Sequence, residues 1–226
     1  GDYILTEFGD FIFKSDPFLE NIQTIWLLHI KIVSNLEKNT TLYWIFNINN
    51  NDIFSFEDFQ IGIYSFSKKL NIESNTNFTE SSLKKDFNVY LNMYLPKLDN
   101  EHIEDKVQNP FWNLKLIKKA HGLKMNYQLI SRSIPDLSKN IFYFSLLEYI
   151  NLKKIENSVT FEQLLTDECS PGRILKLTEY SLRHYLDDIE KNPNFNFKFD
   201  DTAGQRQLFI KNKISGNDFL KKINYE

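Results

Sequence analysis

The chain has 226 residues and a formal net charge of −3, from 27 Lys and Arg against 30 Asp and Glu. Only 7 residues are glycine, well under the roughly 7% average, which argues against glycine-rich phosphate loops, doubly wound nucleotide-binding folds and propellers. Hydrophobic residues make up 42%, enough for a core, and argue against a disordered chain. The near-neutral total removes the simplest argument for nucleic-acid binding, which is a basic excess over the whole chain.

The cysteine content and the hydropathy pattern bear on the compartment. Cys169 is the only cysteine, which excludes an internal disulfide framework and a cysteine-based zinc site and agrees with a reducing cytoplasm. The most apolar stretch, residues 22–33, contains Gln, His and Lys and is too short to span a bilayer, so we expect no membrane segment. Because the chain starts with Gly1 and not with Met, we expect the natural protein to extend further upstream.

Capping residues and helical spacing predict four helices in the first 70 residues. Thr6 is placed to cap the first, and Asp16 followed by Pro17 predicts the start of a long buried helix. Ser55 opens the fourth with a pattern like a capping box. The predicted helices cover residues 6–13, 17–37, 41–48 and 55–70.

A fifth helix and a hairpin complete a first unit. Thr79 opens a helix over residues 79–95 whose apolar positions recur at three and four residues. Two short apolar runs, residues 114–117 and 125–130, flank a lysine-rich turn and predict a β-hairpin. Helices followed by a two-stranded wing are the order of a winged-helix unit, which we assign to residues 16–134 with residues 79–95 as its recognition helix.

The same order of elements returns in residues 135–226. Helices are expected over residues 137–153, over residues 161–166 after a capping box at Thr160 and Gln163, for one turn after the cap Ser170-Pro171, and over residues 178–191. A hairpin is expected over residues 195–199 and 207–210 with its turn at residues 200–205. We therefore predict a mainly α fold with small β-hairpins (α+β), arranged as tandem winged-helix-like units. Residues 1–15 are expected to be the tail of a further unit upstream.

Charge is distributed unevenly along the chain. Residues 1–60 carry nine acids and three lysines, whereas residues 106–139 carry seven basic residues and one acid. The basic segment centres on the predicted wing, so polar and basic residues of the fifth helix and of the wing are candidates for contact with DNA. The alternatives are a solvated helix face and a winged helix that binds protein. The candidates are Ser81, Ser82, Lys84, Lys85, Lys115, Lys118, Lys119 and Lys124.

Two polar segments of the second unit are weak candidates for catalysis. The first is Ser170-Pro171-Gly172-Arg173, in which a glycine at a helix start suggests that the backbone there approaches something closely. The second is residues 200–206, which hold two carboxylates, a hydroxyl, an amide and an arginine. A functional site would use the carboxylates for a metal or the arginines for phosphate, and the alternative is a structural clamp between Arg173 and Asp201. The four candidates are Asp200, Asp201, Arg173 and Arg206.

The remaining reactive residue types give no motif. The four histidines are not at ligand spacing to one another, and His29 on an apolar helix is expected to be a packed core residue. Cys169 is expected to be an unreactive thiol. Gly62-Ile63-Tyr64 matches only half of the GIY-YIG nuclease signature and lies in a helix-like segment, so it does not indicate a nuclease. No P-loop, GxSxG or kinase motif is present, so we expect no cofactor and no metal.

Several strings together resemble a known family. They are residues 5–13, 16–29, 43–47, 82–86 and 169–177, and the Asp-Asp-Thr-Ala-Gly run at 200–204 with Arg206. In this order they resemble a bacterial domain-of-unknown-function family that is encoded beside DNA phosphorothioation genes (SspB-like). The resemblance covers nearly the whole chain. It implies a role in DNA modification or defence, with partners among the phosphorothioation proteins, and it directs attention to Arg173, Asp201, Thr202 and Arg206.

One departure from the family limits what the resemblance implies. The family pattern begins upstream, with a His-Glu-Thr-Phe segment that this chain lacks. Any catalytic residues of that segment are therefore absent here. Three functions stay open: a DNA-binding component for target recognition or nicking, an adaptor that docks a sulfurtransferase or an ATPase, and a metal-dependent nuclease that uses Asp200 and Asp201.

Overall fold

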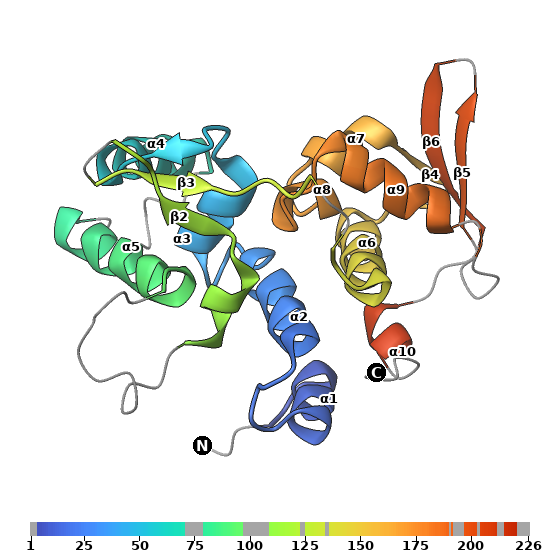
Figure 1. Ribbon diagram of the computed structural model, residues 1–226, viewed down its shortest axis with the longest axis horizontal. Helices are drawn as coiled ribbons and strands as arrows, with labels where there is room; N and C mark the ends of the chain where they lie inside the picture. The colour runs from blue at the N-terminus through green and yellow to red at the C-terminus, as the bar shows by residue number, and fades with distance from the viewer. Residues whose placement is uncertain are drawn as a thin grey trace. The chain divides into compact units, whose positions relative to one another are not determined.

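The computed structural model describes most of the chain and divides it into two compact units (Figure 1). Unit 1 comprises Gly1–Ile30 with Arg132–Glu226, and unit 2 is Lys31–Ser131. We had expected boundaries after residues 15 and 134. The fold is a mixture of helices and two small antiparallel sheets, as expected. The described residues are 4–70, 79–96, 109–122, 125–133, 136–189, 191, 197–202, 204–211 and 215–220.

Unit 2 combines helices with one three-stranded antiparallel sheet of order β1-β3-β2. β1 pairs with β3 through Phe54 and Tyr127, and β2 pairs with β3 over its whole length. The short strand β1 was missing from the sequence prediction. Beyond the end of α2 (Ile22–Val33), the described elements are α3 (Thr40–Tyr43), the π-helix η1 (Trp44–Ile48), β1 (Ile53–Phe54), α4 (Phe56–Lys69), α5 (Glu80–Tyr94), the 3-10 helix η4 (Pro110–Leu114), β2 (Ile117–Lys119) and β3 (Tyr127–Leu129).

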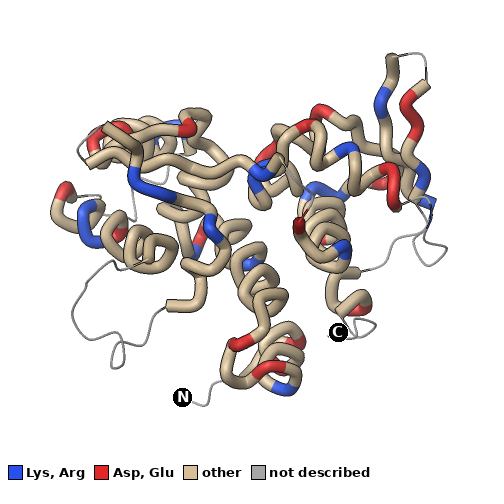
Figure 2. Tube along the Cα trace, in the orientation of Figure 1, with Lys and Arg blue, Asp and Glu red and all other residues tan. Residues whose placement is uncertain are grey.

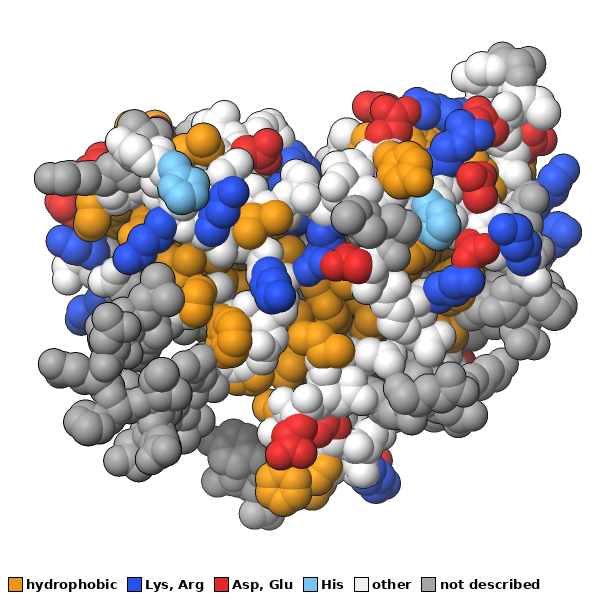
Figure 3. Space-filling view, viewed as in Figure 1, with side chains coloured by type: hydrophobic (Ala, Val, Ile, Leu, Met, Phe, Trp, Pro, Cys, Tyr) orange, Lys and Arg blue, Asp and Glu red, His pale blue; other side chains and the backbone are white. Residues whose placement is uncertain are grey.

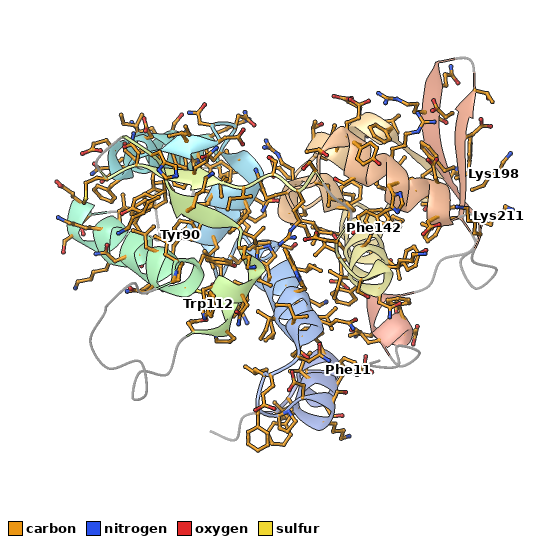
Figure 4. The ribbon with its side chains drawn as sticks, in the orientation of Figure 1. Phe11, Tyr90, Trp112, Phe142, Lys198 and Lys211 are labelled. Atoms are coloured by element: carbon orange, nitrogen blue, oxygen red, sulfur yellow. The ribbon has the colours of Figure 1, made fainter. Side chains whose placement is uncertain are left out.

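Aromatic side chains fill the core of unit 2. Phe59 of α4 and Phe87 of α5 stack with ring centroids 5.1 Å apart, and Phe54 and Tyr90 lie against Phe87. Figure 4 shows Tyr90 pointing from α5 into the interior of the unit, where it is fully buried. Aromatic side chains bury large apolar areas, so these contacts help to hold α5 and the sheet together.

Unit 1 repeats the order of helix, strand, helices and hairpin. Its sheet has the order β4-β6-β5, again antiparallel, and β4 was also missing from the sequence prediction. The central helix α6 is buried on several sides, and its Phe142 stacks on Tyr185 of α9 at 4.8 Å. The described elements are α1 (Glu7–Ser15), most of α2, α6 (Lys139–Lys153), β4 (Ser158–Thr160), α7 (Phe161–Thr166), α8 (Pro171–Ile174), α9 (Glu179–Ile189), β5 (Phe197–Thr202), β6 (Gln205–Ile210) and α10 (Gly216–Leu220).

The local helix signals are confirmed at four starts. The side chains of Thr6 and Thr79 each accept a hydrogen bond from a backbone amide in the first turn. Ser55 with Asp58 and Thr160 with Gln163 form complete capping boxes. These predictions succeed because a cap depends only on residues within one turn of chain.

The start of the long second helix was predicted wrongly. The helix begins at Ile22 and not at Pro17, because Leu19 adopts a left-handed backbone (φ 56°) that an α-helix cannot contain. The Asp16 carboxylate instead accepts the backbone N–H groups of Glu20 and Asn21, both at 3.0 Å, and closes a turn. The helix also ends at Val33, ahead of the expected Glu37.

His29 is a core residue, as expected. It is fully buried in unit 1, and its Nε2 lies 2.8 Å from the backbone oxygen of Ile174, to which it donates. Burial lowers the pKa of His29 to about 4, with the nearby charge of Arg132 acting in the same direction and the hydrogen bond opposing it. The imidazole is therefore neutral near pH 7 and serves to join α2 to α8.

Candidate nucleic-acid interface

Helix α5 presents two lysines to solvent because its apolar face is buried. Leu83, Phe87 and Tyr90 point inward, and Lys84 and Lys85 are exposed on the other side. Of the two candidate serines, Ser81 is exposed. Ser82 belongs to the helix start, since its N–H donates to the Thr79 hydroxyl and its own hydroxyl donates to the Thr79 backbone oxygen at 2.9 Å.

The hairpin of unit 2 adds further lysines. In β2 the side chain of Ile117 is buried, while Lys118 and Lys119 are exposed opposite Gln128 and Tyr127 of β3. Lys115 is exposed at the end of η4, where its backbone is left-handed (φ 52°). Lys124, the last candidate of this group, lies outside the described residues.

These lysines are exposed on α5, at the end of η4 and on β2 of unit 2, and we call the set the basic face. Figure 2 shows basic positions on α5, on β2 and just before β2, and Figure 3 shows basic side chains on the viewed side of unit 2. The acids of α5 are Glu80 and Asp86, and partial burial raises the pKa of Asp86. Basic groups therefore outnumber acidic groups on these elements. The basic face consists of Lys84, Lys85, Lys115, Lys118 and Lys119.

The Ser-Pro-Gly-Arg segment of unit 1 is structural. Ser170 caps α8 by accepting the N–H of Arg173, and a Cβ on Gly172 would lie 2.3 Å from the backbone oxygen of Leu165. The expected close approach is thus confirmed, and the structure shows that its partner is the backbone of helix α7. The Arg173 Nε donates to the backbone oxygen of Thr166 at 3.1 Å. Burial lowers the pKa of Arg173, opposed by the charge of Glu168.

The polar run at 200–206 is mostly strand and not turn, which corrects the prediction. Asp200 and Asp201 belong to β5, where they lie opposite Gln207 and Arg206 of β6. Strand residues alternate between the two faces of a sheet, so these neighbouring carboxylates diverge. A hydrogen bond from the Thr202 side chain lowers the pKa of Asp200. Ala203 lies outside the described residues.

The expected pairing of Arg173 with Asp201 is wrong. Asp201 pairs instead with Arg183 of α9, with Oδ2 and Nη1 2.5 Å apart. Arg206 pairs with Glu179, also of α9, which raises the pKa of Arg206, and its guanidinium lies 4.2 Å from the centre of the Phe161 ring. A clamp between hairpin and helix therefore exists, but its helix partners were not singled out. Only the tertiary fold brings Glu179 and Arg183 to the hairpin.

Asp200 and Asp201 do not belong to a cluster of metal-ligating side chains in the described part of the chain. Among the described residues, no group of three or more His, Cys, Asp and Glu side chains could hold a metal ion. Asp200 and Asp201 have separate protein partners and point to different faces of the sheet.

Within the part of the chain that the structure describes, no helix is both long and apolar enough to cross a membrane.

The fold is similar to two solved structures, described as "Magnesium ion-bound SspB crystal structure" and "SspB crystal structure". Their TM-scores are 0.74 and 0.73, and each is 22% identical in sequence. Both matches cover 97% of this chain, which spans 62% of the length of either relative. No curated protein matches the sequence. The model of a family described as "Protein of unknown function (DUF4007)" matches residues 1–224, and the chain therefore belongs to this family.

Proposed function

We propose that this protein is a DNA-binding component of a bacterial DNA phosphorothioation and defence system, with target recognition or nicking as its task. The observation that carries the proposal is the basic face of unit 2, where exposed lysines lie on a capped helix and on the adjacent hairpin. Phosphate contacts by lysine supply most sequence-independent affinity for DNA. The likeness to the SspB structures favours the phosphorothioation setting, and a cytoplasmic location follows from that setting.

The arrangement of elements supports a winged-helix-like reading of both units as part of this proposal. Each has a first short strand, then helices, then a hairpin whose second strand takes the middle of the sheet. In this proposal α5 is the recognition helix of unit 2 and β2 belongs to its wing. The side chains proposed to contact DNA directly are Ser81 and the five lysines of the basic face.

Salt-dependent binding tests the proposal. With full-length protein and a fluorescent duplex, the wild type should bind with an affinity that falls steeply with salt. Lys118→Gln/Lys119→Gln should make the log–log salt slope shallower by up to about 1.8, because each phosphate contact contributes about 0.9. Lys153→Gln/Lys154→Gln, an exposed lysine pair at the end of α6, is the matched control and should leave the slope unchanged. Equal slopes for both pairs, or no salt-sensitive binding, would refute the proposal.

A second candidate function is an adaptor that docks a sulfurtransferase or an ATPase of the same system. It is favoured by large apolar side chains that residues 4–22 leave exposed, among them Phe13 and Phe18. Co-expression with each candidate partner should give a complex that Phe13→Ser/Phe18→Ser weakens. Absence of any complex with either partner would remove this candidate while leaving the DNA proposal intact.

A further inference from the structure

Strand β5 of unit 1 lies at an edge of its sheet. The strand order β4-β6-β5 means that β5 pairs on one side only, with β6. The middle strand β6 shows which backbone groups that pairing uses. Ile210 of β6 donates its N–H to the backbone oxygen of Asn157, just before β4, at 2.8 Å. Successive residues of a middle strand turn their N–H and C=O groups to opposite neighbours, so Leu208 also turns toward β4 and the odd-numbered residues of β6 turn toward β5.

The residues of β5 therefore fall into two sets. The even-numbered residues of 198–202 lie opposite the odd-numbered residues of β6 and exchange backbone hydrogen bonds with them. The backbone groups of Phe197, Phe199 and Asp201 point away from β6, and no described residue forms a hydrogen bond with them. Three such positions in a row are a template on which a further strand can pair.

The two faces of β5 carry different side chains. Phe199 is buried on the face toward α9, where Asp201 pairs with Arg183. On the opposite face, the charged groups of Lys198 and Asp200 are both accessible and lie 4.0 Å apart. Figure 4 shows the Lys198 side chain pointing away from α9. The open face of this edge strand thus carries one positive and one negative side chain, two residues apart.

We propose that β5 is a dimerisation edge, on which β5 of a second copy of this chain pairs antiparallel with the two-fold axis at Phe199. Only odd-numbered residues offer backbone groups, so odd positions must lie opposite odd positions. Phe199 then lies opposite its own counterpart, and Phe197 lies opposite Asp201 of the second copy. The two three-stranded sheets become one sheet of six strands. This inference depends neither on DNA binding nor on the adaptor function.

Charge selects this register from its neighbours. With the axis at Phe199, Lys198 lies opposite Asp200 of the second copy, and the symmetry makes this pair twice. An axis at Asp200 would set that carboxylate against its own counterpart, and an axis at Lys198 would set two ammonium groups against each other. A lysine on an edge strand usually prevents edge-to-edge pairing. Here the aspartate two residues away makes the same lysine complementary to a second copy.

Charge reversal tests both the edge and its register. Sedimentation velocity of the full-length wild type should show a dimer that increases with protein concentration and decreases with salt. Lys198→Asp and Asp200→Lys each set like charges opposite each other at both pairs and should weaken the dimer about tenfold. Lys211→Asp is the matched control, because it makes the same charge change at an exposed lysine beyond the end of β6, and it should dimerise as the wild type does. Thermal unfolding checks that each variant is folded.

A mixture of the two single variants distinguishes the proposed register from a general effect of charge. Lys198→Asp and Asp200→Lys should form a heterodimer with each other, because every carboxylate of one chain then lies opposite a lysine of the other. The double exchange Lys198→Asp/Asp200→Lys should restore the homodimer for the same reason. A monomer at every concentration up to about 1 mM overturns the inference. So does a dimer that neither single variant weakens, or a loss that neither the mixture nor the double exchange restores.

Discussion

Replacing Gly172 with alanine should destabilise unit 1 more than any ordinary glycine substitution. The backbone of Gly172 needs no glycine for its φ angle, so the constraint is space alone. The new Cβ would lie 2.3 Å from the oxygen and 2.6 Å from the Cα of Leu165. These are backbone atoms, so they cannot rotate away, and α7 and α8 must move apart by about 1 Å to restore ordinary van der Waals contact.

The cost follows from what that movement disrupts. Leu164 of α7 and Ile174 of α8 are fully buried, and Ile174 also accepts the hydrogen bond of His29. Overpacking costs about 1–3 kcal/mol, and the backbone clash favours the upper end. The better helix propensity of alanine offsets at most about 1 kcal/mol of this destabilisation. A net loss of about 2 kcal/mol should lower the melting temperature by about 4–8 °C.

Urea unfolding followed by circular dichroism, with calorimetry for the melting temperature, measures this loss. Gly9→Ala is the control, because its Cβ would meet only side-chain atoms, the Thr6 oxygen at 3.3 Å and Leu5 Cδ2 at 3.6 Å. That variant should stay within about 1 kcal/mol of the wild type. If Gly172→Ala were equally well tolerated, the close packing of α7 on α8 would be refuted.

Three further substitutions follow from the same structure. Gly62→Ala should cost about 2 kcal/mol in urea unfolding, because its Cβ would lie 2.1 Å from Cζ2 of the buried Trp44 ring, and an unchanged midpoint would contradict that packing. The pKa of His29 is about 4 in the folded protein and 6.5 in the unfolded chain, so the unfolded state binds the proton first as the pH falls. The free energy of unfolding of the wild type should therefore decrease by up to about 3 kcal/mol between pH 7 and pH 4. His29→Gln should lack this decrease when the free energy of unfolding is measured across the same pH range. Parallel pH profiles for the wild type and the variant would contradict the prediction. Arg183→Ala should cost less than about 1 kcal/mol, because its ion pair with Asp201 is partly exposed, and a loss above about 2 kcal/mol would show that the clamp matters more than its exposure indicates.

The sequence predicted what depends on neighbouring residues. Thr6, Thr79 and the two capping boxes were identified from spacing, and the helices of both units followed from apolar periodicity. The strands β1 and β4 were missed because runs of two or three residues carry no period, and only pairing with a distant hairpin makes them strands.

For the candidate sites too, features set by neighbouring residues were predictable and contacts made by the tertiary fold were not. Exposure of Lys84 and Lys118 was predictable, since helix and strand periodicity already place them opposite buried neighbours. Exposure of Lys119 was not, because alternation puts it on the same strand face as the buried Ile117. The partners of Asp201 and Arg206 were not, because Arg183 and Glu179 reach the hairpin only through the packing of α9 on β5. Polar residue types alone therefore did not distinguish a clamp from a catalytic site.

This distinction decides where function is to be sought. Asp201 and Arg206 form ion pairs with residues of α9. Arg173 is half-buried, and its Nε donates a hydrogen bond to the backbone of α7. All three charged groups therefore have partners within the protein. The lysines of the basic face are exposed on elements that other, buried residues hold in place, and the exposed Phe13 likewise lies away from the packed residues Phe8 and Ile12 of α1. Side chains that the fold does not need are the ones free to meet another molecule. Substituting them should change binding while leaving the unfolding free energy nearly constant, whereas substitutions in the clamp should act on stability first.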